Sequence, residues 1–198
     1  YQAERIELSI KGGWQDQYAT TFGGFNWIDF NSREIVVSPL RIHKDILLEL
    51  EYNLMLFNLG GNRNSSTIHE KNINAAKNKK NKIENAYKEM SDIAENMKNT
   101  LLKGDLKGFG DQLDYSWQAK KKLNIQTSNK KIDLLYSLAK KYGALGGKLL
   151  GAGQNGFMLI YASPLYQKKI IKAFSSKGCT LENFNFTNSG LDTWTVER

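Results

Sequence analysis

One acidic residue near the start of the chain stands in surroundings that suit acid–base chemistry. Asp16 follows the glycine pair Gly12 and Gly13, and its neighbours, beginning with Gln15, are uncharged and mostly polar. Such a carboxylate could accept a proton from a substrate hydroxyl. It could equally be an ordinary carboxylate in the first turn of a helix, where the helix dipole favours negative charge. The residue types alone leave both interpretations open.

A second candidate lies in the glycine-rich segment 146–156. Its last six residues match the spacing G-x-G-x-x-G: Gly151, Ala152, Gly153, Gln154, Asn155 and Gly156. A dinucleotide-binding loop of this pattern follows a strand and opens a helix, whereas this one is expected to follow a helix and run into the apolar segment 157–162. Its backbone N–H groups could face an anion. A tight turn that needs positive φ is the alternative.

Arg63 is the third candidate. It stands in the polar segment 60–66, just before a predicted helix, with Ser65 and Ser66 beside it. The free N–H groups at a helix start favour an anion, and a guanidinium with adjacent hydroxyls could hold a phosphate or a sugar. A simple cap and turn is the alternative.

The composition excludes several kinds of site. A single cysteine, Cys179, cannot form an internal disulfide, and only two histidines accompany it, without zinc-ligand spacing. No apolar run approaches the ~18 residues of a membrane span, and the start of the chain lacks the layout of a secretory signal, so a cytoplasmic protein is expected. The net charge of +8 attracts polyanions in general. The densest basic run, residues 71–82, has no interleaved aromatic residues, which weighs against nucleic acid.

The elements that would position these residues follow from periodicity. A short helix between two glycine pairs would carry Asp16. Segments 25–30 and 34–37 are rich in aromatic and β-branched residues and predict a hairpin, and residues 53–59 predict a buried strand. The apolar segment 157–162 predicts another strand, and alternating aromatics within 184–196 predict a final hairpin.

Helices are predicted between these strands. Residues 65–123 contain two, separated by Gly104 and an N-cap at Asp105. The apolar seam of the first comprises Ile83, Tyr87, Met90, Ala94, Met97 and Leu101, and that of the second Leu106, Phe109, Leu113 and Trp117. A third helix would begin after Asn129 and present Ile132, Leu135, Tyr136 and Ala139. A fourth would begin at Ser163 and Pro164. The whole pattern predicts an α+β chain.

Taken together, these segments resemble GHMP kinases, and within that family the D-glycero-D-manno-heptose 7-phosphate kinase branch. The resemblance covers nearly the whole chain and rests on four segments in the right order: residues 12–30, Arg63 with Ser65 and Ser66, Ser116 and Trp117 with Lys120, Lys121 and Lys122, and residues 143–153. It implies a GHMP-kinase C-terminal domain, with helices packed on an antiparallel sheet, over residues 39–198. Residues 1–38 would be a remnant of the N-terminal kinase domain.

The resemblance also implies a role for each candidate residue. Asp16 would be the catalytic carboxylate near the acceptor hydroxyl, and the substrate would be contacted by Gly12, Gly13, Gln15 and Arg63. The loop from Gly151 to Gly156 would lie near the nucleotide phosphates, although Gln154 and Asn155 replace a pair that is usually glycine in the family. The implied reaction is ATP-dependent phosphoryl transfer to D-glycero-D-manno-heptose 7-phosphate, which gives the 1,7-bisphosphate.

Two further motifs of the family would precede the Asp16 segment, where only fifteen residues stand. One of them wraps the phosphates of ATP and supplies a magnesium ligand. ATP and Mg²⁺ are therefore expected to be held mainly by a missing N-terminal half, and no metal ligand is assigned in this chain. The expectation is a C-terminal fragment, inactive alone, with an uncovered apolar edge that favours a homodimer.

Two alternatives stay open. A related GHMP kinase could act on fucose, galactose or mevalonate, because acceptor choice depends heavily on the missing half. A non-catalytic module could instead use the basic surface to bind nucleic acid or a protein partner, and its affinity for nucleic acid would then depend on salt. The aromatic residues fall on stripes typical of a core, which weighs against this last interpretation.

Overall fold

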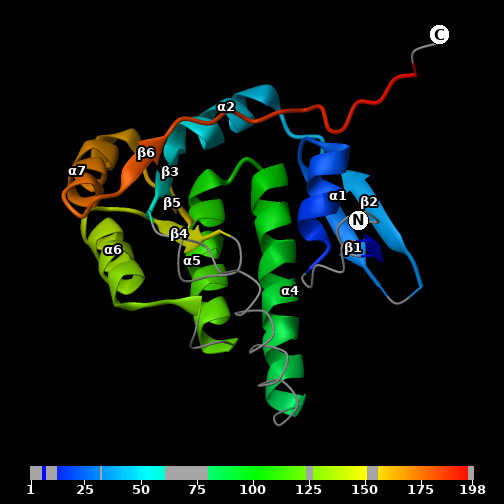
Figure 1. Ribbon diagram of the computed structural model, residues 1–198, viewed down its shortest axis with the longest axis horizontal. Helices are drawn as coiled ribbons and strands as arrows, with labels where there is room; N and C mark the ends of the chain where they lie inside the picture. The colour runs from blue at the N-terminus through cyan, green and yellow to red at the C-terminus, as the bar shows by residue number, and fades with distance from the viewer. Residues whose placement is uncertain are drawn as a thin grey trace. The chain divides into compact units, whose positions relative to one another are not determined.

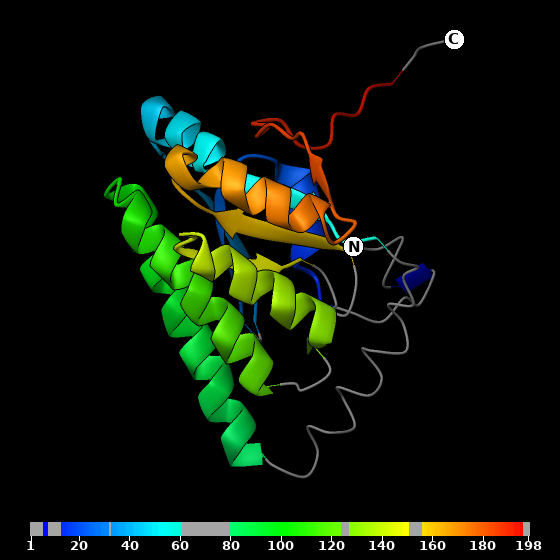
Figure 2. The same ribbon diagram turned by 90° about the vertical axis from the view of Figure 1, so that its left-hand side faces the viewer.

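The computed structural model describes residues 6–7, 13–31, 33–60, 80–123, 127–150 and 156–195, with the side chains of the fourth range described from residue 85. Figures 1 and 2 show the ribbon from two directions. The chain forms two compact units: residues 1–42 with 185–198, and residues 43–184. The two ends of the chain therefore belong to the same unit. The expected division into domains 1–38 and 39–198 concerns a complete kinase and stays a prediction.

The first unit contains a short helix and a β-hairpin: α1 (Gln15–Phe22), β1 (Asn26–Phe30) and β2 (Ile35–Pro39). The two strands pair antiparallel. The side-chain oxygen of Asn31 accepts hydrogen bonds from the N–H groups of Arg33 and Glu34, both at 2.9 Å, and so closes the turn between them. The predicted helix and hairpin are both confirmed.

The predicted C-terminal hairpin is wrong. Residues 183–195 contain no strand. Part of this segment packs within the first unit, where the N–H of Gly24 donates to the carbonyl oxygen of Thr187 at 2.9 Å. Phe186 packs edge-on against Phe25, with ring centroids 4.9 Å apart. Because its aromatic residues are used to pack against a distant part of the sequence, their alternation does not indicate a local strand pair.

The second unit is built on a four-stranded antiparallel sheet in the order β4-β5-β3-β6. Its strands are β3 (Leu54–Asn58), β4 (Gly146–Leu149), β5 (Phe157–Tyr161) and β6 (Thr180–Glu182). The central strand β3 pairs with β5 on one side and β6 on the other. The buried strands predicted at 53–59 and 157–162 are confirmed.

Two long helices, α4 (Lys80–Leu102) and α5 (Leu106–Leu123), lie side by side in this unit (Figures 1 and 2). Gly104, with φ at +73°, lies in the turn between them. The carboxylate of Asp105 accepts the N–H of Gly108 at 2.8 Å, so it caps α5 as predicted. Leu106, Leu113 and Trp117 are buried, which confirms the predicted face of α5.

The seam of α4 differs from the predicted one. Tyr87 is 63% exposed and Ala94 is exposed as well, while Ile93 is buried with Leu101. The large apolar side chains of α4 that are buried or half-buried, within its described part, are Met90, Ile93, Met97 and Leu101, which are spaced by three, four and four residues. The prediction placed Ala94 in the seam where the structure has Ile93. The three-residue step therefore falls between Met90 and Ile93, and not before Met97 as predicted. Ile83 lies outside the described side chains.

Strand β4 was not predicted, because residues 146–149 were expected to belong to a loop. A side-chain carbon on Gly146 would overlap the carbonyl oxygen of Gly110 and lie 2.7 Å from the backbone nitrogen of Asp114. Because Gly146 has no side chain, the backbone of β4 can approach the backbone of α5 at Gly110. Strand β4 depends on this backbone contact and contains no β-branched residue. Its amino-acid composition therefore does not predict a strand.

The core lies between the sheet and three helices. Helices α6 (Lys130–Lys141) and α7 (Pro164–Ser175) join Trp117 of α5 in one buried cluster with the strands. Asn129 caps α6 as predicted, accepting the N–H of Ile132 at 3.0 Å. The rings of Phe57 and Phe174 lie 4.2 Å apart. Helix α2 (Lys44–Asn53) leads directly into β3. The α+β fold with helices on an antiparallel sheet is confirmed.

Candidate functional site

Asp16 lies in the first turn of α1, in the first unit. Its side chain is exposed, and within the described part of the chain its carboxylate has no hydrogen-bond or ion-pair partner. Gln15 and Gly13 beside it are also exposed, and Gly12 lies outside the described residues. A carboxylate with free oxygen lone pairs at a helix start can accept a hydrogen bond from a hydroxyl group. The structure therefore brings Asp16, Gln15 and Gly13 together on one accessible helix end.

Aromatic packing holds this helix end in place. The ring of Phe30, at the end of β1, meets Tyr18 edge-on at 5.6 Å and Trp14 edge-on at 6.4 Å. Gly23, with φ at +64°, ends the helix. Because these contacts come from residues on both sides of Asp16, the start of α1 is fixed against the hairpin while the carboxylate faces outward.

The second candidate segment connects β4 to β5. The N–H of Leu150 donates to the carbonyl oxygen of Phe157 at 2.8 Å and extends the strand pair by one step. Of the predicted phosphate loop, Gly156 is described, with φ at +115°, and residues 151–155 lie outside the described residues. The loop therefore joins two antiparallel strands. The predicted strand after the loop is confirmed, but the expectation that the loop follows a helix is wrong, because β4 precedes it. No helix follows the loop directly, so the strand-to-helix context of a dinucleotide fingerprint is not met.

The end of β3 lies beside this loop. The N–H of Leu59 donates to the carbonyl oxygen of Gly156 at 2.9 Å, and the amine of Lys131 donates to the carbonyl oxygen of Leu59 at 2.7 Å. Arg63 follows a few residues later, outside the described residues. Leu59 and Gly156, which are about 100 residues apart in the sequence, are thus neighbours at this end of the sheet.

A half-buried carboxylate in α5 was missed by the sequence analysis. Asp114 accepts hydrogen bonds from three side chains: the hydroxyl of Tyr136 at 2.6 Å, the amide of Gln118 at 3.0 Å and the amine of Lys140 at 2.9 Å. Lys140 also donates to the carbonyl oxygen of Leu145 at 2.7 Å, just before β4. The Asp114 network, comprising these four side chains, ties α5 and α6 to the strand that bears the glycine loop.

The pKa values in the network follow from these contacts. Burial by itself would raise the pKa of Asp114, but the hydrogen bonds from Gln118, Tyr136 and Lys140, together with the charge of Lys140, outweigh it and lower the pKa. Burial and the bond to Asp114 raise the pKa of Tyr136, although the N–H of Gly147 donates to its hydroxyl oxygen and acts in the opposite sense. Asp114 is therefore an anion and Tyr136 a neutral donor at neutral pH.

Lys148 is a second titratable group at this strand. It lies in β4, two residues before Leu150, and is half-buried. Burial lowers the pKa of its amine. Among the residues that the structure describes it forms no ion pair, whereas Lys121, Lys122 and Lys140 each pair with a carboxylate.

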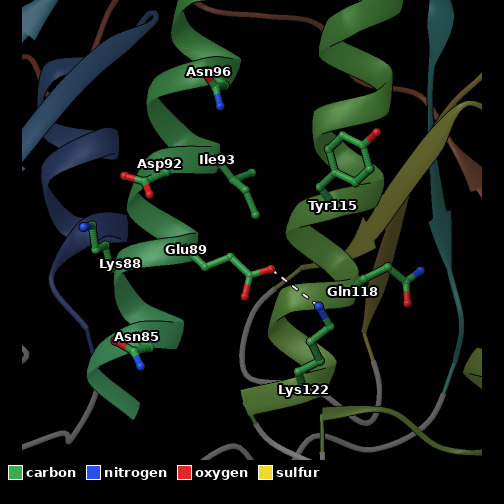
Figure 3. Close-up of a pocket in the computed structure, with 9 residues that line it drawn as sticks. All are labelled: Asn85, Lys88, Glu89, Asp92, Ile93, Asn96, Tyr115, Gln118 and Lys122. Carbon is green, nitrogen blue, oxygen red and sulfur yellow. Dashed lines mark ion pairs between the residues drawn. The ribbon is translucent and has the colours of Figure 1, made fainter. Parts of the chain in front are cut away.

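A groove of about 380 Å³ lies between α4 and α5. Figure 3 shows Glu89 of α4 and Lys122 of α5 reaching toward each other across it, and their charged atoms lie 3.5 Å apart. The other lining residues are Asn85, Lys88, Asp92, Ile93, Asn96, Tyr115 and Gln118. None of the candidates predicted from the sequence lines this groove.

Within the described residues, no three His, Cys, Asp or Glu side chains come together as a metal site would require. Asp16 could supply one oxygen ligand, whereas Mg²⁺ prefers six. The described residues by themselves therefore do not fit a magnesium site. Over the same ranges, no helix combines the length and the apolar character needed to cross a bilayer.

Comparison with known proteins shows which family has this architecture. Residues 93–180 match the family described as GHMP kinases C terminal. The chain is 36% identical, over 202 residues, to the D-glycero-alpha-D-manno-heptose 7-phosphate kinase of Campylobacter jejuni, and the match covers 99% of this chain and 58% of that protein. The chain belongs to the GHMP kinase family. The resemblance inferred from its glycine-rich and aspartate segments is confirmed.

Solved GHMP kinase structures share the fold. A Campylobacter jejuni protein described as a candidate sugar kinase superposes with a TM-score of 0.69 and 32% identity, over 99% of this chain and 55% of that one. A D-glycero-D-manno-heptose 1-phosphate kinase from Bacteroides thetaiotaomicron superposes with a TM-score of 0.65 and 25% identity, over 100% and 54%. The chain thus spans about half the length of these relatives.

Proposed function

We propose that these 198 residues form the C-terminal part of an ATP-dependent GHMP kinase that phosphorylates a sugar phosphate in the cytoplasm. The acceptor is D-glycero-D-manno-heptose 7-phosphate and the product is its 1,7-bisphosphate. One observation supports this choice of acceptor: the chain is 36% identical, along 99% of its length, to the Campylobacter jejuni heptose 7-phosphate kinase. ATP and Mg²⁺ are held mainly by residues outside this chain.

In this function Asp16 is the catalytic carboxylate. Its exposed position at the start of α1, with no partner among the described residues, supports a role in accepting a hydrogen bond from the acceptor hydroxyl. Gly12, Gly13 and Gln15 would line the sugar beside it, and Arg63 would bind the acceptor phosphate. Phosphoryl transfer needs little covalent help, so alignment of the acceptor and electrostatic stabilisation supply most of the rate.

In this proposal the glycine loop, residues 151–156, binds the nucleotide. Residues 151–156 follow the edge strand β4, and their backbone N–H groups would face the phosphates of ATP. Support comes from the end of β3, where the N–H of Leu59 donates to the carbonyl oxygen of Gly156, the last residue of the loop. Both phosphate-binding segments of the proposed site therefore start from one end of the sheet.

The Asp16→Asn variant of the full-length protein tests this proposal. We expect kcat with heptose 7-phosphate to fall at least about 100-fold, because an amide cannot accept the proton or stabilise the developing charge. Coupled measurement of ADP release gives the rate, and circular dichroism checks that the fold is retained. Asp29→Asn is the matched control, since Asp29 is also an exposed carboxylate of the first unit. Full activity in Asp16→Asn would rule out the catalytic role.

A panel of acceptors tests the choice of sugar. It contains heptose 7-phosphate, heptose 1-phosphate, fucose, galactose and mevalonate, each at equal concentration with the same full-length enzyme. We expect the highest kcat/KM with heptose 7-phosphate. A higher value with an unphosphorylated acceptor would replace the proposed substrate while leaving the kinase activity standing.

A further inference from the structure

A pocket of about 440 Å³ lies at the end of the strand pair where β3 begins and β5 finishes. At this end Leu54 lies opposite Tyr161, and the N–H of Ala162 donates to the carbonyl oxygen of Asn53 at 2.9 Å. Gly156 lies at the other end of the pair, about 17 Å away at the rise of an antiparallel strand. The volume is within the range of small-molecule sites. None of the candidates predicted from the sequence lines this pocket.

Two buried polar side chains line the pocket and keep hydrogen-bonding capacity unused. Asn53 is 7% exposed and Tyr161 is 4% exposed. The amide nitrogen of Asn53 donates to the hydroxyl oxygen of Tyr161 at 3.3 Å. Among the described residues, the amide oxygen of Asn53 accepts no hydrogen bond and the hydroxyl proton of Tyr161 has no acceptor. Because buried polar groups are normally paired, one acceptor and one donor remain available to a ligand in the pocket.

Charged side chains surround these two buried groups. Glu49 of α2 and Asp105, which precedes α5, are exposed carboxylates, and within the described ranges neither forms an ion pair. They outnumber Lys107, the one cation among the lining residues. Burial raises the pKa of Tyr161, and the charges of Glu49 and Asp105 raise it further, although the bond from Asn53 acts in the opposite sense. The negative charge therefore reaches the buried hydroxyl, which stays protonated at neutral pH.

These groups determine which ligand chemistry fits. A hydroxyl group both donates and accepts, so it can accept the proton of Tyr161 and donate to the oxygen of Asn53. An ammonium group only donates, and it suits the carboxylate of Glu49 better than that of Asp105, which already accepts the N–H of Gly108. An anionic ligand would be repelled by both carboxylates.

We propose that this pocket binds a small organic cation that carries an ammonium group and a hydroxyl group, as an amino alcohol does. The hydroxyl group binds between Asn53 and Tyr161, and the ammonium group lies toward Glu49. The inference is independent of the proposed kinase function, because it uses only residues around one end of the β3–β5 pair.

Three probes with the same six-membered ring test the chemistry of the ligand. In NMR titrations of the full-length protein, trans-4-aminocyclohexanol carries both groups, 1,4-cyclohexanediol lacks the charge and cyclohexylamine lacks the hydroxyl. We expect the amino alcohol to bind about 2- to 10-fold more tightly than either analogue, the range for one screened ion pair or one hydrogen bond. No saturable binding of the amino alcohol, or equal affinity of either analogue, would overturn the inference.

Substitutions assign the binding to this pocket. Tyr161→Phe removes only the hydroxyl and should weaken the amino alcohol about 2- to 10-fold. Glu49→Gln changes an exposed side chain, so the fold is retained, and should weaken it about 2- to 5-fold. The affinity of the diol should not respond to Glu49→Gln, which separates the loss of charge from any change in folding.

A pair of lysine variants provides the opposite sign. Lys107→Gln removes a cation at the pocket and should leave the affinity for the amino alcohol unchanged or raise it. Lys177→Gln is the matched control and should bind like wild type, because Lys177 is exposed and follows the far end of α7. Wild-type affinity in both Tyr161→Phe and Glu49→Gln would overturn the inference. Phosphorylation of a sugar plays no part in these measurements, so either proposal can fail while the other stands.

Discussion

At the scale of single residues, Asp114 shows how hydrogen bonds can keep a half-buried carboxylate in its charged form. Its two carboxylate oxygens accept three side-chain hydrogen bonds from α5 and α6. The side chain of Asp114 is 22% exposed and that of Lys140 is 39% exposed, so solvent weakens their attraction. The hydrogen bonds, more than the ion pair, should account for what the network contributes to stability.

Asp114→Asn tests this network. At pH 7 we expect the variant to lose about 1–3 kcal/mol of unfolding free energy, because an amide accepts weaker hydrogen bonds and leaves Lys140 without a carboxylate. Urea unfolding followed by circular dichroism measures the loss. Asp111→Asn on the same helix is the control, since Asp111 has no ion pair within the described residues, and it should stay within about 0.5 kcal/mol of wild type.

The same comparison has a definite dependence on pH. The pKa of Asp114 is lowered in the folded protein, so its contribution is complete above the unfolded-state pKa of about 4 and is lost as the pH falls through the lower folded-state pKa. The gap between wild type and Asp114→Asn should therefore shrink below about pH 4. A gap that stays constant from pH 7 to pH 3 would contradict the assignment of the network to the ionised carboxylate.

At the scale of elements, the contact of β4 with α5 is made by glycine backbones. Gly146→Ala places a methyl group against the carbonyl oxygen of Gly110. We expect a loss of about 2 kcal/mol or more, because neither backbone can withdraw without disturbing the sheet or the helix. Gly13→Ala is the control, since nothing lies within 4 Å of the added carbon. Equal stability of the two variants in urea would show that β4 can shift away from α5.

Prediction from the sequence succeeded for elements defined by local patterns. The β1–β2 hairpin, the cap at Asp105 and the buried face of α6 all depend on residues close together in the chain, and each was found. Strand β4 escaped because its signal is a contact between Gly146 and Gly110, which no local pattern records. The proposed roles of Asp16 and the glycine loop came from family resemblance, since neither residue type nor spacing decided them.

The half-buried polar groups could not be predicted from the sequence either. Asp114 and Gln118 are four residues apart on one helix, which is a weak signal, and their partners Tyr136 and Lys140 come from the next helix. Lys148 could not be distinguished from an exposed lysine until the strand register placed it beside Leu159. Side chains whose function depends on burial are recognised only when the fold is known.

At the scale of the whole molecule, the chain has two compact units, and the first is assembled from both ends of the sequence. The final segment packs on the residues that follow α1 instead of forming its own hairpin, so it supports the helix that carries Asp16. The net charge of +8 is compatible with phosphorylated substrates as well as with nucleic acid. The net charge therefore does not identify the ligand, which has to be inferred from the individual candidate sites.

The account centres on transfer of phosphate from ATP to a heptose phosphate. The most direct measurement is phosphorus NMR of the reaction of the full-length protein with ATP, Mg²⁺ and D-glycero-D-manno-heptose 7-phosphate. We predict a new resonance of a sugar phosphate at the anomeric carbon, growing in step with ADP, and its absence with Asp16→Asn. ADP formation without a new sugar phosphate, or no reaction by a protein that binds ATP, would contradict the account.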